Sequence, residues 1–119
     1  GYKTHTPELD FRYGFRGIKR DEPIKKGDIR KIYIDIKSPS NPTKQISVDN
    51  VFYKIYIKEN AYNETLIIDW MPLNVGVCEN WFVLDTSWMI PQSYTLDFKV
   101  VNKQTVKTYP EQIKFHVIE

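Results

Sequence analysis

The residues best suited to chemistry in this chain are a single cysteine and two histidines. Cys78 could act as a nucleophile with His116 as its base, and Asp69 or Asp85 would then orient the histidine. Cys78 lies in a predicted loop and His116 on a late strand, however, and neither sits in a catalytic motif. His5 and His116 are 111 positions apart, which is no spacing for metal ligands. We predict no catalytic residue, no metal and no cofactor.

Two other kinds of site, a catalytic carboxylate pair and a phosphate-binding glycine loop, are not supported by the positions of the residues. Asp85 and Asp97 could share a proton, but acids on the outer faces of strands usually contact water. Asp85 opens the polar run 85–87, which is typical of a turn that satisfies its own backbone. Gly14 and Gly17 lack the phosphate-binding spacing, and no predicted helix follows them. The sequence therefore predicts a protein that is not an enzyme.

Aromatic side chains offer a different chemistry, the stacking of a sugar ring. Trp88 lies in a polar corner and Tyr62 in a turn, so these two are the candidates for an exposed stacking site. Trp70 and Trp81 lie in predicted strands, where tryptophan is more typical of a core. A carbohydrate-binding or adhesion module is therefore the alternative function to be tested.

Basic and aromatic residues alternate near the start of the chain. The segment 11–31 holds eight bases and three acids, a net charge of +5, against +2 for the whole chain. We interpret residues 1–27 as a basic, aromatic N-terminal arm. It could lie on the edge of its own domain, dock on a neighbouring subunit, or contact nucleic acid, which we consider the weakest of the three. The residues predicted to bind a partner are Phe11, Arg12, Tyr13, Phe15, Arg16 and Arg20.

The rest of the chain alternates between apolar and polar residues, which predicts antiparallel β-strands. About seven strands are expected, drawn from the ranges 28–37, 45–48, 50–58, 65–70, 81–85, 94–101, 105–109 and 112–118. Ile32, Ile34 and Ile36 should face the core. Phe52 and Tyr56 should face outward beside lysines, either as cross-strand pairs or as a contact surface.

Composition supports one all-β domain. The chain has 119 residues, with 14 isoleucines and one alanine, and β-branched residues favour strands whereas alanine favours helices. One cysteine cannot form an internal disulfide, so a disulfide-stapled secreted scaffold is not expected. No apolar run approaches the ~20 residues that span a membrane, and no secretory signal is evident at the start. We expect no membrane partner.

The segment 89–98, MIPQSYTLDF, resembles the corner and following strand of immunoglobulin-like and fibronectin-type-III-like domains. The resemblance covers residues 28–119 and implies an antiparallel Ig-like β-sandwich. It implies that Tyr94 is the corner tyrosine, with its hydroxyl bonded to backbone upstream, and that Trp70 or Trp81 fills the core. The cysteine pair of antibody domains is absent, which argues against membership of the antibody type.

A cysteine-poor Ig-like domain with a basic arm is also similar to the accessory domains of tailed-bacteriophage virions. Such domains sit on capsid, neck and tail proteins. The resemblance implies a structural or interaction module that docks on other protein subunits of a virion, with the virion as its location. No small-molecule substrate is expected. Fold alone does not fix function, so these are expectations.

Overall fold

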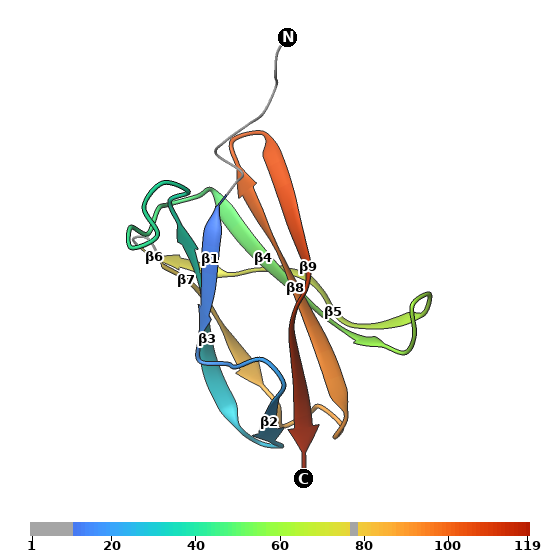
Figure 1. Ribbon diagram of the computed structural model, residues 1–119. Helices are drawn as coiled ribbons and strands as arrows, with labels where there is room; N and C mark the ends of the chain where they lie inside the picture. Colours follow the sequence, from blue (N-terminus) through green and yellow to red (C-terminus); the bar gives the residue numbers. More distant parts are fainter. Residues whose placement is uncertain (1–10, 77–78) are drawn as a thin grey trace.

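The computed structural model describes residues 11–76 and 79–119, and these residues form an all-β protein with two sheets and no helix (Figure 1). Nine strands occur in the described part of the chain. Their bounds are β1 Arg12–Arg16, β2 Glu22–Lys25, β3 Ile29–Lys37, β4 Asn50–Lys58, β5 Glu64–Pro72, β6 Asn74–Gly76, β7 Glu79–Asp85, β8 Ser93–Asn102 and β9 Thr105–Ile118.

The strands divide between a four-stranded and a five-stranded sheet. Sheet 1 has the order β1-β3-β7-β6, and sheet 2 has the order β2-β9-β8-β4-β5. All neighbouring strands are antiparallel except β2 and β9, which are parallel. Figure 1 shows β1 and β3 on one side of the molecule and β8 and β9 on the other, with the C-terminus at the same end as β2.

The core lies between the sheets and is formed by the inward side chains of alternating positions. Ile32, Ile34 and Ile36 of β3 are buried, as the alternation predicts. From sheet 2 the corresponding residues are Tyr94, Leu96, Phe98 and Val100. The Tyr53 ring stacks on Phe82 across the two sheets, with 3.8 Å between ring centroids. Removal of these apolar surfaces from water is the main stabilising term.

The last two predicted strands are one continuous strand, β9, interrupted by a bulge. Leu96 pairs with Ile113 and Phe98 with Tyr109, so β9 carries two more residues than β8 over this stretch. Pro110 lies in the bulge, where its missing N–H breaks no ladder hydrogen bond. The predicted strand at 45–48 is reduced to a single bridge between Lys37 and Gln45.

Three aromatic residues are placed differently from the sequence prediction. Tyr56 was predicted to be exposed, and it is 2% exposed although it does lie on the outer side of sheet 2. The resemblance implied that Trp70 or Trp81 fills the core, and neither residue belongs to the core cluster. In β7 the even-numbered residues Asn80, Phe82 and Leu84 are buried, so Phe82 and not Trp81 faces the core.

Residues 11–27, expected to be an arm separate from the sandwich at 28–119, contribute one strand to each sheet. β1 pairs with β3, and β2 pairs with β9. Gly17 has a φ of 90° where the chain crosses between sheets, and a Cβ there would collide with the Lys31 carbonyl oxygen. The crossing therefore requires glycine. Residues 1–10 lie outside the described part.

The corner before β8 is held by Tyr94. Its side chain is buried, and its hydroxyl donates a hydrogen bond of 2.6 Å to the carbonyl oxygen of Ile90, four residues upstream. Gln92 donates to the same hydroxyl at 3.2 Å. This is the backbone contact expected of a corner tyrosine, and it fixes the entry of the chain into β8.

Candidate interaction face

The outer side of sheet 1 carries a row of cationic and aromatic side chains across three strands. Strand register places Arg16 of β1 opposite Tyr33 of β3, and Tyr33 opposite Trp81 of β7. The Arg16 guanidinium lies 4.0 Å from the centroid of the Tyr33 ring, and the Lys31 ammonium lies 4.1 Å from that of Trp81. Cations at these distances are attracted to the ring faces. We call Arg16, Tyr33, Lys31 and Trp81 the sheet 1 row.

The arginine at one end of the row is fixed by a buried carboxylate. Arg16 donates two hydrogen bonds to Asp35, of 2.7 and 2.9 Å, and the Asp35 side chain is 6% exposed. The hydrogen bond to Asp35 raises the pKa of the Arg16 guanidinium above its ordinary value. A bidentate pair of this kind sets both the position and the plane of the guanidinium. Arg16 is therefore held in place by its own domain.

Exposed apolar residues flank the row. Val83 lies opposite Lys31 and is 49% exposed, and Ile29 lies opposite Asp85 and is 61% exposed. Arg12 adds a further exposed cation at the other end of β1. Together with the row, these residues form a surface that we call the sheet 1 face. Tryptophan, tyrosine and arginine beside apolar groups are the composition of protein interface hot spots.

The outer side of sheet 2 has similar residues but a closed arrangement. Lys54 lies over the rings of Tyr56 and Trp70, and Lys99 lies over Phe52 and Trp70. At the centre of this surface Tyr56 donates a hydrogen bond of 2.8 Å to Asp97, which also accepts the N–H of Glu111. Asp97 is 5% exposed. Burial, and then the bond to Asp97, raises the pKa of the Tyr56 hydroxyl far above its ordinary range.

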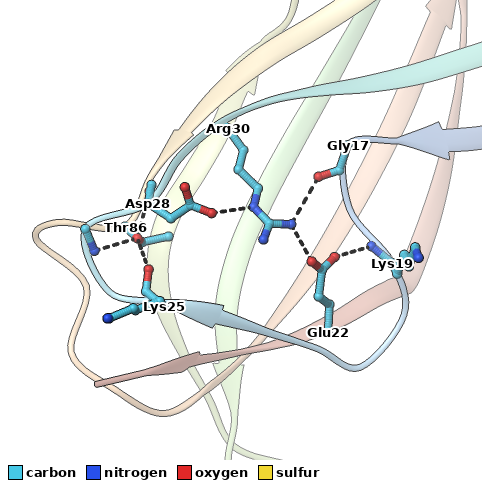
Figure 2. A network of polar contacts seen from close by, with 8 residues as sticks. Gly17, Lys19, Glu22, Lys25, Asp28, Arg30 and Thr86 are labelled. Atoms are coloured by element: carbon cyan, nitrogen blue, oxygen red, sulfur yellow. Dashed lines mark hydrogen bonds and ion pairs between the residues drawn. The ribbon is translucent and has the colours of Figure 1, made fainter.

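Much of the charge in segment 11–31 is used within the molecule. Figure 2 shows Arg30 between Glu22 and Asp28. The two N–O distances are 2.6 Å to Glu22 and 2.7 Å to Asp28. Thr86 joins the same corner by accepting the N–H of Gly27 at 3.0 Å and donating to the Asp28 carbonyl oxygen at 2.8 Å. Burial opposes ionisation of Glu22, but its hydrogen bonds from Arg30 and the Lys19 N–H outweigh burial, so its pKa is lowered. This corner locks β2 and β3 together.

The six residues predicted to bind a partner lie in three different places. Arg12 and Arg16 belong to the sheet 1 face. Phe11 is buried, and Tyr13 and Phe15 point between the sheets, where their rings lie 5.0 and 5.7 Å from that of Phe98. Arg20 lies beside sheet 2. Three placements were considered for the arm: on its own domain, on a neighbouring subunit, or on nucleic acid. Residues 11–27 adopt the first, because β1 and β2 pair with strands of their own domain.

The candidate stacking residues are exposed but lie on different loops. Trp88 is 54% exposed in the loop between β7 and β8, and Tyr62 is 94% exposed in the turn between β4 and β5. Within the described residues, the Trp88 and Tyr62 rings make no aromatic contact with each other. Each would have to act separately on a ligand.

Two acids considered for catalysis, Asp69 and Asp85, accept hydrogen bonds from nearby backbone. Cys78 lies outside the described residues. Asp69 accepts the N–H of Trp70, and Asp85 accepts the N–H of Ser87, whose hydrogen bonds lower the pKa of Asp85. Within residues 11–76 and 79–119, no group of three His, Cys, Asp or Glu residues could hold a metal. The same part of the chain has no helix able to span a membrane.

Sequence reasoning found the ingredients of the sheet 1 face but not their assembly. Alternation alone places Lys31 and Tyr33 on the outward side of their strand. The pairing of β1 with β3 and of β3 with β7, which brings Arg16 and Trp81 to the same row, is a long-range property. Comparison with protein-family models, with characterised proteins and with solved structures finds no match to this chain.

Proposed function

We propose that this chain is an immunoglobulin-like interaction module of a larger assembly, a bacteriophage virion, that docks on neighbouring subunits through the sheet 1 face. The order of strands supports the Ig-like part of this proposal. Sheet 1 follows the order of the ABED sheet, and β9-β8-β4-β5 follows G-F-C with an added C′ strand. β2 then corresponds to a first strand that changes sheets.

The corner at Tyr94 is a second support for the Ig-like fold. In antibody domains the second cysteine of the intersheet disulfide follows two residues after the corner tyrosine. That position is Leu96 here, with no exposed surface. Apolar packing would therefore replace the disulfide, which is consistent with a chain that has one cysteine. The virion assignment rests on the resemblance to phage accessory domains.

The observation that carries the docking proposal is the sheet 1 row itself. Arg16 and Lys31 lie over Tyr33 and Trp81 in the centre of an exposed sheet, with Val83 beside them. Because Asp35 and the rings already restrict the two cations, little side-chain freedom remains to be lost on binding. The face thus combines order with exposed apolar surface.

The charge of the face indicates the chemistry of its partner. The outward side chains carry four cations on β1 and β3 (Arg12, Arg16, Lys31 and Lys37) and three carboxylates (Asp35 on β3, Glu79 and Asp85 on β7). The cations thus gather on the β1 and β3 side of the face. We propose that the neighbouring subunit presents carboxylates to that side, next to an apolar contact with Val83. Such a contact should form faster at low ionic strength than at high ionic strength.

The assembly test uses two variants with matched exposure. Val83→Glu places a charge on the sheet 1 face, and Leu66→Glu places one on the outer side of sheet 2, where Leu66 is 53% exposed. We expect the Leu66 variant to be incorporated into particles and the Val83 variant to be left in the soluble fraction. Equal incorporation of both variants would reject docking through the sheet 1 face.

A carbohydrate-binding or adhesion function is the second candidate, and the exposure of Trp88 favours it. An indole that is half exposed in a loop can stack on a sugar ring. A glycan array probed with the native chain and with Trp88→Ala tests this function. Binding that the Trp88 variant loses would support it, and no binding by the native chain would remove it.

A further inference from the structure

A cleft of about 450 Å³ opens on the outer side of sheet 2, far from the sheet 1 face in the fold. It lies where the corner before β2, the end of β4, the start of β8 and the bulge of β9 meet. A volume of this size suits a small ligand rather than a protein segment.

The backbone that forms this cleft is unusual. Non-glycine residues with positive φ number three in the described chain, and two of them, Asp21 (59°) and Glu111 (52°), line the cleft. The Asp21 N–H is bonded to the Lys114 carbonyl oxygen at 2.6 Å, and the Glu111 N–H is bonded to Asp97 at 2.8 Å. Left-handed backbone persists where surrounding contacts enforce it and occurs often at binding sites. Both walls of the cleft are therefore built and fixed.

The residues that line the cleft include three cations, Arg20, Lys58 and Lys114, and two carboxylates, Asp21 and Glu111, which gives a net charge of +1. Glu111 pairs with Lys58 at 2.8 Å, and Asp21, whose side chain is 65% exposed, lies 3.7 Å from the His116 ring. Arg20 and Lys114 are exposed, and neither forms an ion pair with another residue of the described part of the chain. A single negative group such as a carboxylate can lie against both.

The remaining lining is polar. Gln92, Ser93, Thr95 and Gln112 line it with hydroxyl and amide groups, and Ile57 is the one apolar residue among those that line the cleft. The amide of Gln112 is held by Tyr13 and Pro110 and that of Gln92 by Tyr94, so each has one remaining N–H for a ligand. Ser93 is oriented by a 2.7 Å hydrogen bond to the His116 ring. Many neutral hydrogen-bonding groups beside two cations match a ligand that carries several hydroxyls and one carboxylate.

We propose that this cleft binds a sugar acid, with its carboxylate against Arg20 and Lys114 and its hydroxyls against Ser93 and the neighbouring amides. The proposal is independent of docking through the sheet 1 face, because the two sites share no residue. It also differs from stacking on Trp88, since no aromatic ring lines the cleft.

The test is a titration of the isotope-labelled chain with D-glucuronate, followed by amide chemical shifts. We expect saturable shifts confined to residues 20–21, 57–58, 92–95 and 111–114, with a dissociation constant on the order of 1 mM. D-glucose lacks the carboxylate and acetate lacks the hydroxyls, so each should bind at least about tenfold more weakly.

Variants locate the site. Arg20→Gln and Lys114→Gln should each weaken glucuronate binding by about tenfold, whereas Arg12→Gln, which removes an exposed cation from sheet 1, should leave it unchanged. Each variant must keep the native spectrum, which the same experiment records. The proposal is overturned if glucuronate causes no saturable shift, if glucose or acetate binds equally well, or if Arg12→Gln weakens binding as much as the cleft variants.

Discussion

The outer sides of the two sheets carry the same kinds of side chain but use them differently. On both, cations lie over aromatic rings of neighbouring strands. On sheet 2 the centre is buried, because Tyr56 and the bulge of β9 both bond to Asp97. On sheet 1 the centre stays accessible, with Val83 49% exposed beside Trp81. The first arrangement stabilises the domain, and we propose that the second awaits a partner.

The largest effect on stability is expected at the centre of sheet 2. Asp97→Ala would leave the Tyr56 hydroxyl and the Glu111 N–H without their shared acceptor in a buried position. We expect a loss of about 2–4 kcal/mol in the free energy of unfolding, measured by urea denaturation. A double-mutant cycle with Tyr56→Phe separates the two donors, and additive losses would contradict the shared bond.

The corresponding carboxylate of sheet 1 should matter less. Asp35→Ala removes both bonds to Arg16, but the Arg16 side chain is 48% exposed and can turn to water. We expect a loss of about 1 kcal/mol in the same assay. A loss as large as that of Asp97→Ala would mean that sheet 1 is also closed on itself.

The corner around Arg30 belongs to neither face, and its contribution to the free energy of unfolding should depend on pH through Glu22. The pKa of Glu22 is lowered in the folded state, so its stabilisation is present above its unfolded value of 4.5 and is lost as pH falls through the lower folded pKa. Glu22→Gln should therefore cost about 1 kcal/mol at pH 7 and less below about pH 4. Urea midpoints at several pH values measure this, and a constant difference would contradict it.

The smallest effects are expected for the exposed apolar residues of the two faces. Val83→Glu and Leu66→Glu should each change the free energy of unfolding by less than about 0.5 kcal/mol, because neither side chain belongs to the core. Thermal or urea unfolding measures this directly. A large loss for Val83→Glu would show that the Val83 side chain contributes to folding. The assembly test would then use Val83→Thr in place of Val83→Glu.

The sequence predicted the positions of the strands better than it predicted which strands pair and in which register. Alternation identified β3, β4, β7 and β8 and the inward direction of Ile34 and Leu96, since a period of two is a local property. It failed at Tyr56, because the burial of that ring depends on the bulge opposite Asp97, which lies in strands distant in sequence. Bulges and register are set by contacts that no short window contains.

The candidate site was predictable only in part. Arg12 and Arg16 were singled out by their charge, and both lie on the sheet 1 face. Phe11, Tyr13 and Phe15 were grouped with them, although in a strand successive side chains point to opposite sides. Alternation within residues 11–16 could have separated the two sets. The contribution of Trp81 could not have been found this way, since it depends on the pairing of β3 with β7.

Photo-crosslinking in the assembly that we propose for this chain tests the difference between the faces most directly. A photoreactive phenylalanine analogue is placed at Val83 in one chain and at Leu66 in another, two positions of similar exposure on opposite sheets. We predict a discrete crosslinked product with another subunit from position 83 and none from position 66. Crosslinking from position 66 alone, or from neither position, would contradict docking through the sheet 1 face.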